Sequence, residues 1–403
     1  MISLDEARAH VLARVAPTSP ERVSLDRAHG LVLAEPVVSV EAVPPFANTA
    51  MDGFAVRAAD TANPPVTLEL VGTIAAGDAP ELTVARGQAA RIMTGAPMPD
   101  GADAVVMVER TSVDAAGSSV VIEISVEAGN HVRGAGEDVR PGDEVFPAGT
   151  LLEAGHLGVL ASIGVFEVAA HRQPRVGVLS TGDELVEGPG PLRPGQIRDS
   201  NRRTLLALLH EAGFEGVDLG LARDDESVIA AAFGRGVESC DAVLSSGGVS
   251  MGDFDYVKVV LDRIGDMRWM QIAIKPAKPF AFGLVDGVPV FGLPGNPVSS
   301  MVSFELLAKP ALRAMAGRRH PDPPIVRARS EDSLSHPPDG KTHFVRVSAF
   351  SGADGVWCVS RSGGQGSHQL TAMARADALA VVPDGVDIEP GDYVDILVLD
   401  GVR

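Results

Sequence analysis

Between about residues 174 and 316, short apolar segments alternate with helical segments, and this alternation constrains the fold more than any other feature of the sequence. Strands that alternate with helices are typical of a mostly parallel sheet covered by helices on both faces. The predicted strands are Val176–Leu179, Val217–Leu221, Ala242–Leu244, Met270–Ile274 and Val288–Phe291, and the predicted helices are Asn201–Ala212, Glu226–Phe233, Tyr256–Ile264 and Val298–Ala316. We therefore expect a central doubly wound α/β domain.

The region before this domain has a different pattern. Residues 3–15 and 150–164 are typical of capped helices, with Ser3 and Thr150 at the caps. Between them, over about 43–145, short β-branched and apolar runs alternate with Gly/Pro turns. The pattern predicts helical segments around a β-rich insertion.

The region after the α/β domain is again β-rich. Prolines close to residue 321 mark a linker, and residues 325–403 contain only short strands with Gly/Pro turns. A small β-barrel or sandwich is the expected architecture. The predicted boundaries are an N-terminal region 1–170 (helical segments 1–42 and 146–170 around the insertion), an α/β domain 171–320 and a C-terminal β domain 321–403.

The charge of the chain limits its partners. Lys and Arg number 34 against 53 Asp and Glu, a net charge of −19, so the overall field does not favour nucleic acid or an anionic membrane. Two cysteines exclude a disulfide scaffold. No signal peptide is visible and no apolar run approaches the roughly 20 residues of a membrane span, so we expect a cytoplasmic protein. The chain is also poor in lysine, yet Lys275 and Lys278 stand three residues apart.

Four loops of the α/β domain follow predicted strands, and ligands of open parallel sheets bind at the carboxyl ends of the strands. Two of these loops are rich in small residues, one opens the long helix that begins near Val298, and one supplies Lys275 and Lys278. Backbone N–H groups, a helix N-terminus and two ammonium groups suit a phosphorylated or oxyanionic ligand. Each loop alone could be an ordinary turn or helix start. The four loops are 179–184, 245–253, 275–279 and 293–300.

Several carboxylates follow different strands of the same predicted sheet. Mg²⁺ near a polyanion takes one or two carboxylates together with substrate oxygens, and the candidates are Glu184, the pair Asp224 and Asp225, and Asp253 with Asp255. The competing interpretation is that such residues cap helices, and Asp183 and Asp224 look the most cap-like. No serine has an identifiable histidine partner, so a hydrolase triad is not expected. The histidines are dispersed and lack the spacing of metal ligands.

Eight blocks in order resemble the molybdopterin molybdenumtransferase family, the bacterial counterparts of the gephyrin E domain. The resemblance covers essentially the whole chain. Thr49, Phe54 and Ala277 stand where many members have Ser, Tyr and Gly, and none of these differences removes an ionisable group. The blocks are 44–56, 91–97, 136–138, 180–185, 246–250, 274–279, 293–297 and 366–368.

The resemblance implies that the chain inserts molybdate into adenylylated molybdopterin with Mg²⁺ and releases AMP. It assigns catalytic roles to Asp52, Thr94, Glu184, Asp225 and Asp255, with Glu184 and Asp255 at the metal. Substrate binding falls to Asp138, Thr181, Ser246, Gly247, Gly248, Ser250, Pro294, Gly295, Asn296 and Pro297, and molybdate binding to Lys275, Lys278, Ser299, Arg346 and Ser367.

The resemblance also implies a homodimer, in which Asp52 and Thr94 complete the site of the partner subunit. Contact with the molybdopterin adenylyltransferase and with acceptor molybdoenzymes is a further expectation. Two alternatives remain, a nucleotide-pyrophosphate enzyme of the competence-damage type and a non-catalytic scaffold like the gephyrin E domain. The sequence does not separate molybdate from tungstate, because the two oxyanions have nearly the same size and charge.

Overall fold

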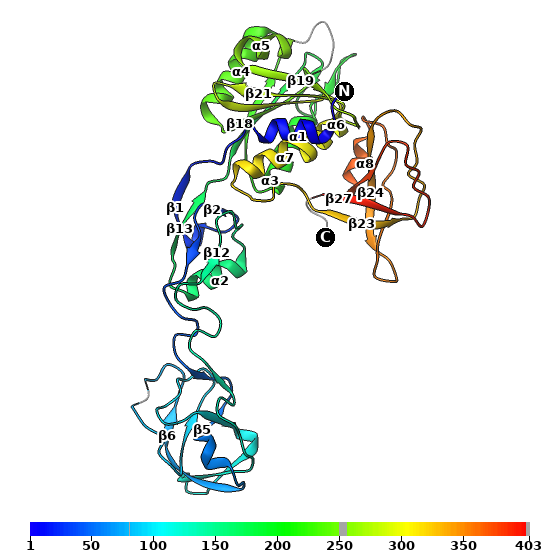
Figure 1. Cartoon of the computed structure of the whole chain (residues 1–403). Helices are drawn as coiled ribbons and strands as arrows, with labels where there is room; N and C mark the ends of the chain where they lie inside the picture. Colours follow the sequence, from blue (N-terminus) through cyan, green and yellow to red (C-terminus); the bar gives the residue numbers. More distant parts are fainter. Residues whose placement is uncertain (80, 250–255, 400–403) are drawn as a thin grey trace.

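The computed structural model describes residues 1–79, 81–249 and 256–399. Figure 1 shows an elongated chain: a β-rich module with β5 and β6 occupies one end, the α/β part occupies the other, and the C-terminal strands lie beside the α/β part. A narrower segment with β1, β13, β12 and α2 connects the two ends.

The α/β part is built on a six-stranded sheet, and the predicted fold class is confirmed. Four neighbouring strands are parallel, and the last two, β21 and β19, run antiparallel. Strand β21 was not expected, because the prolines at its start suggested a loop. In spatial order the strands are β17 (Glu215–Ala222), β14 (Arg175–Thr181), β18 (Ala242–Ser246), β22 (Val288–Leu293), β21 (Pro279–Val285) and β19 (Asp266–Gln271).

Helices pack on both faces of this sheet, as the alternating pattern predicted. One face buries apolar residues of the N-terminal helix, α3 and the long C-terminal helical segment, and the other buries those of α4 and α5. The long segment is continuous over 297–315 but contains a π-helical turn. The helices are α1 (Leu4–Leu12), α3 (Asn201–Glu211), α4 (Glu226–Ser239), α5 (Tyr256–Ile264), α6 (Pro297–Ser303), η4 (Phe304–Ala308) and α7 (Lys309–Met315).

The N-terminal region confirms one predicted helix cap and corrects another. Ser3 caps α1, since its hydroxyl accepts a 3.0 Å hydrogen bond from the backbone N–H of Glu6. Helix α2 (Ala154–Ser162) begins later than predicted, because Glu153 is its N-cap and the Thr150 hydroxyl donates to the Pro147 carbonyl instead. The strands here are β1 (Pro20–Ser24), β2 (Val32–Leu33), β3 (Val37–Val38), β12 (Glu144–Phe146) and β13 (Glu167–His171).

The insertion forms a six-stranded sheet of its own, with an apolar cluster on each side. Its strands, in spatial order, are β8 (Ala104–Met107), β5 (Gly53–Val56), β7 (Gln88–Ile92), β6 (Val66–Ile74), β10 (Ser119–Ile122) and β9 (Thr111–Val113). A short pair, β4 (Asn48–Thr49) with β11 (Val132–Arg133), lies next to it along the chain.

The C-terminal strands close into a five-stranded barrel, because β24 pairs with both β25 and β26. The predicted small β-barrel is thereby confirmed. Strand β20 (Ile274–Lys275), which comes from the α/β part, adds to the barrel in parallel with β24. The remaining elements are β23 (Ile325–Ser330), β24 (Thr342–Ser351), β25 (Trp357–Arg361), α8 (Leu370–Ala374), β26 (Ala378–Val382) and β27 (Tyr393–Val398).

Candidate functional site

Three of the predicted loops leave the same edge of the central sheet. Ser180 at the end of β14 stands in register with Ser246 at the end of β18, and Ser246 stands in register with Leu293 at the end of β22. Because these strands are parallel, the loops that follow them emerge side by side. The structure therefore places Thr181, Ser246 to Gly248 and Pro294 to Pro297 at one edge.

Gly247 is the point at which these loops touch. Its φ is +97°, and a Cβ added there would lie 2.9 Å from the Thr181 carbonyl oxygen, so a larger residue would strain the backbone and collide. Its N–H donates to the Leu293 carbonyl at 3.2 Å. Gly248 also has a positive φ, of 71°. The small residues of this loop allow close contact between the loops after β14, β18 and β22.

Asn201 is a residue of this edge that the sequence reasoning missed. It starts α3, and its side-chain Nδ2 donates to the Ser246 hydroxyl and to the Gly295 carbonyl, both at 2.7 Å. One amide thus connects the loop after β18 to the loop after β22. The only signal in the sequence was its place at a helix start, which does not reveal a bridge between loops.

A buried charge network lies behind Asn201. The Ser180 hydroxyl donates to Asp199 at 3.0 Å, and Arg202 donates to the other oxygen of Asp199 at 2.9 Å. Arg202 is buried and also pairs with Asp218 and Glu187. The ion pair to Glu187 holds the loop between β15 (Leu185–Val186) and β16 (Ile197–Arg198), so the network fixes both the start of α3 and the segment after Glu184.

The predicted carboxylates divide into different roles. Glu184 is exposed, and a Cβ added at Gly182 would lie 2.5 Å from one of its carboxylate oxygens, so its side chain folds over this loop. Asp225 is the N-cap of α4, with bonds of 2.9 and 3.0 Å from the N–H groups of Ser227 and Val228. The Ser227 hydroxyl also donates to it, and this bond contributes most to lowering the pKa of Asp225.

The expectation that Asp183 and Asp224 would be the caps is wrong. Each of these two residues accepts a long hydrogen bond from the backbone N–H of the other, at 3.4 and 3.3 Å. They therefore join the loop after β14 to the loop after β17. The predicted site residues Ser250, Asp253 and Asp255 lie outside the described residues.

A second group of predicted residues lies where the barrel meets α6. The Ser367 carbonyl accepts a 3.2 Å bond from the N–H of Val298, in the first turn of α6, and Ser299 in the same turn is buried. Arg346 on β24 donates to the Gly364 and Gly366 carbonyls at 2.7 and 3.3 Å. Arg346, Ser367 and the start of α6 are therefore connected.

Arg346 retains unused binding capacity. Its side chain is fully buried, and its Nε and Nη1 have no hydrogen-bond partner within the part of the chain that the structure describes. Burial lowers the pKa of the guanidinium. A buried cation with free donors is costly unless a partner satisfies it, and an oxyanion would be a suitable partner.

The two clustered lysines lie at the junction between sheet and barrel. Lys275 is in β20, in register with His343 of β24, and its Nζ lies 3.8 Å from an Asp339 carboxylate oxygen. The carbonyl of Lys278 accepts a 2.8 Å bond from Ile272, and both lysines are exposed. Their ammonium groups are accessible to a ligand from solvent.

Asp52 and Thr94 form a local unit in the β-rich module. Thr94 donates two bonds of 2.7 Å to Asp52 Oδ1, from its N–H and its hydroxyl, and these lower the pKa of Asp52. Both residues flank strands of the module, which Figure 1 places at the opposite end of the chain from α6. The structure does not bring this pair to the edge of the central sheet within one chain.

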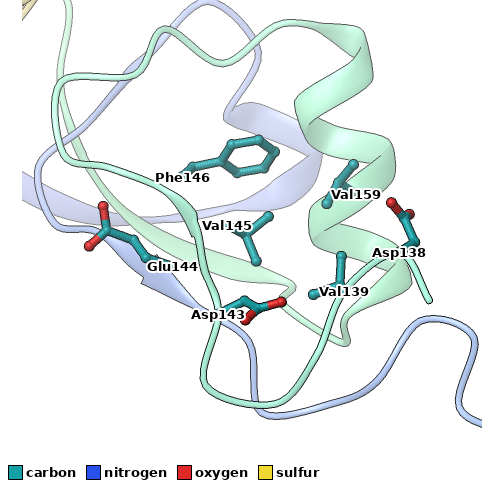
Figure 2. Close-up of a pocket in the computed structure, with 7 residues that line it drawn as sticks. All are labelled: Asp138, Val139, Asp143, Glu144, Val145, Phe146 and Val159. Atoms are coloured by element: carbon teal, nitrogen blue, oxygen red, sulfur yellow. The ribbon is translucent and has the colours of Figure 1, made fainter. Parts of the chain in front are cut away.

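Asp138 lies in the connecting segment and lines a cavity of about 440 Å³. Figure 2 shows Asp138 and Asp143 at one side of this cavity, with Val139, Val159 and Phe146 as its apolar wall. Like Asp52, Asp138 belongs to a part of the chain separate from the central sheet edge. Among the described residues, no helix is long and apolar enough to cross a membrane.

Comparisons with known proteins cover nearly the whole chain. The MoeA N-terminal region (domain I and II) matches residues 2–164, a probable molybdopterin binding domain matches 177–314, and the MoeA C-terminal region (domain IV) matches 327–399. A molybdopterin molybdenumtransferase from Haemophilus influenzae is 39% identical over 98% of each chain. One from Nostoc sp. is 38% identical over 91% of this chain and 85% of that protein. The crystal structure of a molybdopterin biosynthesis moeA protein from Pyrococcus horikoshii superimposes with a TM-score of 0.84 at 28% identity, over 99% of this chain and 100% of that one.

Proposed function

The chain belongs to the molybdopterin molybdenumtransferase family, and we propose that the edge of its central sheet and the barrel junction bind the two substrates of that enzyme. The protein is a transferase of molybdenum cofactor biosynthesis, which inserts molybdate into adenylylated molybdopterin and releases AMP. The pyrophosphatase alternative is not favoured, because all three MoeA regions match in order. The scaffold alternative is not favoured, because the ionisable residues of the proposed site, among them Asp52, Glu184 and Lys278, are retained.

The observation that carries this assignment is that helix α6 contacts both groups of proposed site residues, the loops at the edge of the central sheet and the residues at the barrel junction. The helix begins at the loop that Asn201 joins to Ser246, and its first turn contacts Ser367 of the barrel. A phosphate on the small-residue loops and an oxyanion near Arg346 would therefore lie on the two sides of one helix start, where backbone N–H groups favour anions.

In this proposal each group of residues has one task. The backbone of Ser246 to Gly248 and of Pro294 to Pro297 holds the pyrophosphate of the adenylylated pterin. Lys275, Lys278, Arg346, Ser299 and Ser367 hold molybdate, whose oxygens accept hydrogen bonds from the cations. Water attacks the phosphoanhydride bond, which breaks to release AMP and leaves the pterin phosphate. The two dithiolene thiols replace one oxo ligand of molybdate, and that oxygen leaves as water with their two protons.

A metal ion is a further part of the proposal. The exposed carboxylate of Glu184, folded over the loop after β14, is the type of oxygen ligand that Mg²⁺ prefers, and Asp255 is its proposed companion. Bound Mg²⁺ would neutralise charge on the leaving phosphate. The helix-capping bonds of Asp225 all go to Oδ1, so its proposed catalytic role falls to Oδ2.

We also propose that the active unit is a homodimer. Asp52, Thr94 and Asp138 lie in parts of the chain remote from α6, so a second copy would have to supply them to the site. A cytoplasmic location, and transient contact with the molybdopterin adenylyltransferase and with acceptor molybdoenzymes, complete the proposal.

The decisive experiment measures AMP release by the purified full-length protein. We expect release only when adenylylated molybdopterin and molybdate are both present, with tungstate tested in place of molybdate in a parallel reaction. Release that needs neither oxyanion would contradict molybdate transfer and favour a nucleotide pyrophosphatase. No release with either oxyanion, from folded protein with Mg²⁺, would favour a scaffold.

A further inference from the structure

Three side chains of metal-binding type gather on the loop that leads into β24, outside the residues proposed for molybdate transfer. They are His336, Asp339 and His343, and their ligand atoms all lie within 4.8 Å of one another. Two imidazoles and a carboxylate are a common ligand set of Zn²⁺ sites that keep one position open.

His336 is already in the form that a metal requires. Its Nδ1 lies 3.0 Å from the Pro337 carbonyl oxygen, which accepts a hydrogen bond, so Nδ1 carries the proton and Nε2 carries the lone pair. That Nε2 atom is buried and has no hydrogen-bond partner in the described part of the chain. A ring nitrogen fixed by a backbone carbonyl on its other side is the usual arrangement of a metal-bound histidine.

Asp339 divides its two oxygens between different neighbours. Oδ2 lies 2.9 Å from Lys341 Nζ and 3.8 Å from Lys275 Nζ, whereas Oδ1 lies 3.2 Å from His343 Nε2. Oδ1 is therefore the oxygen on the histidine side, and the two lysines lie on the side of Oδ2.

The spacing of Oδ1 and the His343 nitrogen suits a shared metal ion. Two ligand atoms bound to one tetrahedral zinc at about 2.1 Å stand roughly 3.4 Å apart, close to the 3.2 Å separation here.

One local movement is needed. The rings of His336 and His343 are stacked, with centroids 3.3 Å apart and planes 3° from parallel, so their lone pairs do not yet converge. We infer that the His336 ring turns its Nε2 toward Asp339, because His343 Nε2 already lies 3.2 Å from Asp339 Oδ1. The two lysines on Oδ2 oppose a cation, so we expect weaker binding than in a closed structural zinc site.

We propose that His336, Asp339 and His343 form a site for Zn²⁺ or a similar divalent transition metal, with water as the fourth ligand. Imidazole and carboxylate ligands favour Zn²⁺ and its neighbours over Mg²⁺. His343 on β24 stands in register with Lys275 on β20. The ion would therefore stabilise the loop before β24, next to the strand pair that joins β20 to the barrel.

The test titrates metal-stripped full-length protein with ZnCl₂ by calorimetry and with Co²⁺ by visible absorption. We expect one ion per chain, a tetrahedral cobalt spectrum and a higher Tm with Zn²⁺. His336→Gln and Asp339→Asn should each weaken binding by at least about 100-fold, since even an outer-shell partner is worth 10- to 100-fold. The exposed His320 and His29 supply matched controls, and His320→Gln and His29→Gln should bind as the wild type does.

Circular dichroism would establish that each variant is folded, and His336→Gln and Asp339→Asn provide two independent variants if one fails. The proposal is overturned if wild-type protein shows no saturable Zn²⁺ binding, or if both folded variants bind Zn²⁺ as tightly as the wild type. It is also overturned if the histidine controls lose binding equally. None of these outcomes depends on molybdate transfer, so the proposed metal site and the proposed function can each be disproved without the other.

Discussion

Thr94 donates two hydrogen bonds of 2.7 Å to the same carboxylate oxygen of Asp52, one from its backbone and one from its hydroxyl. Hydrogen bonds to the charged form of a carboxyl stabilise that form, so they lower the pKa of Asp52. The pair connects the end of β7 to the start of β5. It holds an ionised carboxylate on the surface of the β-rich module.

This relationship predicts a pH effect. Thr94→Val removes the hydroxyl bond but keeps the backbone bond, so the pKa of Asp52 should rise part of the way to its ordinary value. If the ionised form is required, activity is lost as pH falls through that pKa, and a higher pKa moves the loss to higher pH. The acidic limb of the rate of AMP release should therefore shift upward in Thr94→Val. An unchanged limb would remove Asp52 ionisation from the mechanism.

A shared site predicts complementation between two variants that are each nearly inactive when molybdate is held well below the wild-type half-saturating concentration. Asp52→Asn and Lys278→Ala affect different parts of the chain, and a mixed dimer would contain one intact site of its two. Random pairing of equal amounts makes half of the dimers mixed, so co-expression should restore about a quarter of the wild-type rate of AMP release. A rate no greater than the mean of the two variants alone would contradict a site shared between subunits.

The bridge formed by Asn201 predicts a binding defect. Asn201→Ala removes two hydrogen bonds, each worth about 1 kcal/mol, and frees the loop after β18 from the loop after β22. We expect the KM for adenylylated molybdopterin to rise roughly tenfold or more, with half-saturation by molybdate changed much less. The exposed Asn63 offers a matched control, because Asn63→Ala should leave both values unchanged. Equal loss for both substrates would indicate a general structural role instead.

The strands and loops of the central sheet could be predicted, because a strand buried on both faces is a continuous apolar run and its loop follows directly. The cap of α4 was assigned to Asp224, but a helix that begins at Glu226 takes the residue directly before it, Asp225, as its N-cap. Strand β21 was not predicted, because Pro279 at its start suggested a loop. In the structure β21 pairs with both β19 and β22 despite this proline.

Some residues of the candidate site could be predicted from the sequence and others could not, depending on whether a local pattern marks them. Gly247 and Lys275 belong to short blocks that can be recognised along the chain. Asn201 was missed and Arg346 was assigned through the family resemblance alone, because their contacts lie 45 and 18 residues or more away along the chain and no local pattern encodes them. The metal-ligand cluster also escaped notice, since His336 and His343 converge only because the loop between them turns back.

The clustered lysines predict a defect specific to the oxyanion. Lys278→Ala and Lys275→Ala each remove a cation that, in contact with molybdate, donates a charge-assisted bond of roughly 1.5–3 kcal/mol. Half-saturation by molybdate, measured by AMP release at saturating pterin substrate, should rise about ten- to one-hundred-fold. Lys278→Arg should restore half-saturation by molybdate only partly, because the planar guanidinium group directs its N–H donors differently from an ammonium group. Arg27→Ala removes one exposed positive charge from the connecting segment, outside the proposed site, and should leave half-saturation as in the wild type.

The unused donors of Arg346 predict that molybdate stabilises the folded protein. Nε and Nη1 of this buried side chain have no partner in the described part of the chain, so an oxyanion that reaches them relieves a desolvation cost. A ligand that binds only the folded state raises Tm with its concentration. Molybdate should therefore raise the Tm of the wild type. Sulfate at equal ionic strength is the control, and a rise in Tm with molybdate beyond the rise with sulfate reports specific binding rather than screening. Arg346→Met, which keeps the buried length of the side chain without the charge, should lose most of the molybdate-dependent rise, whatever its own Tm. A full rise in Arg346→Met would place the oxyanion away from β24.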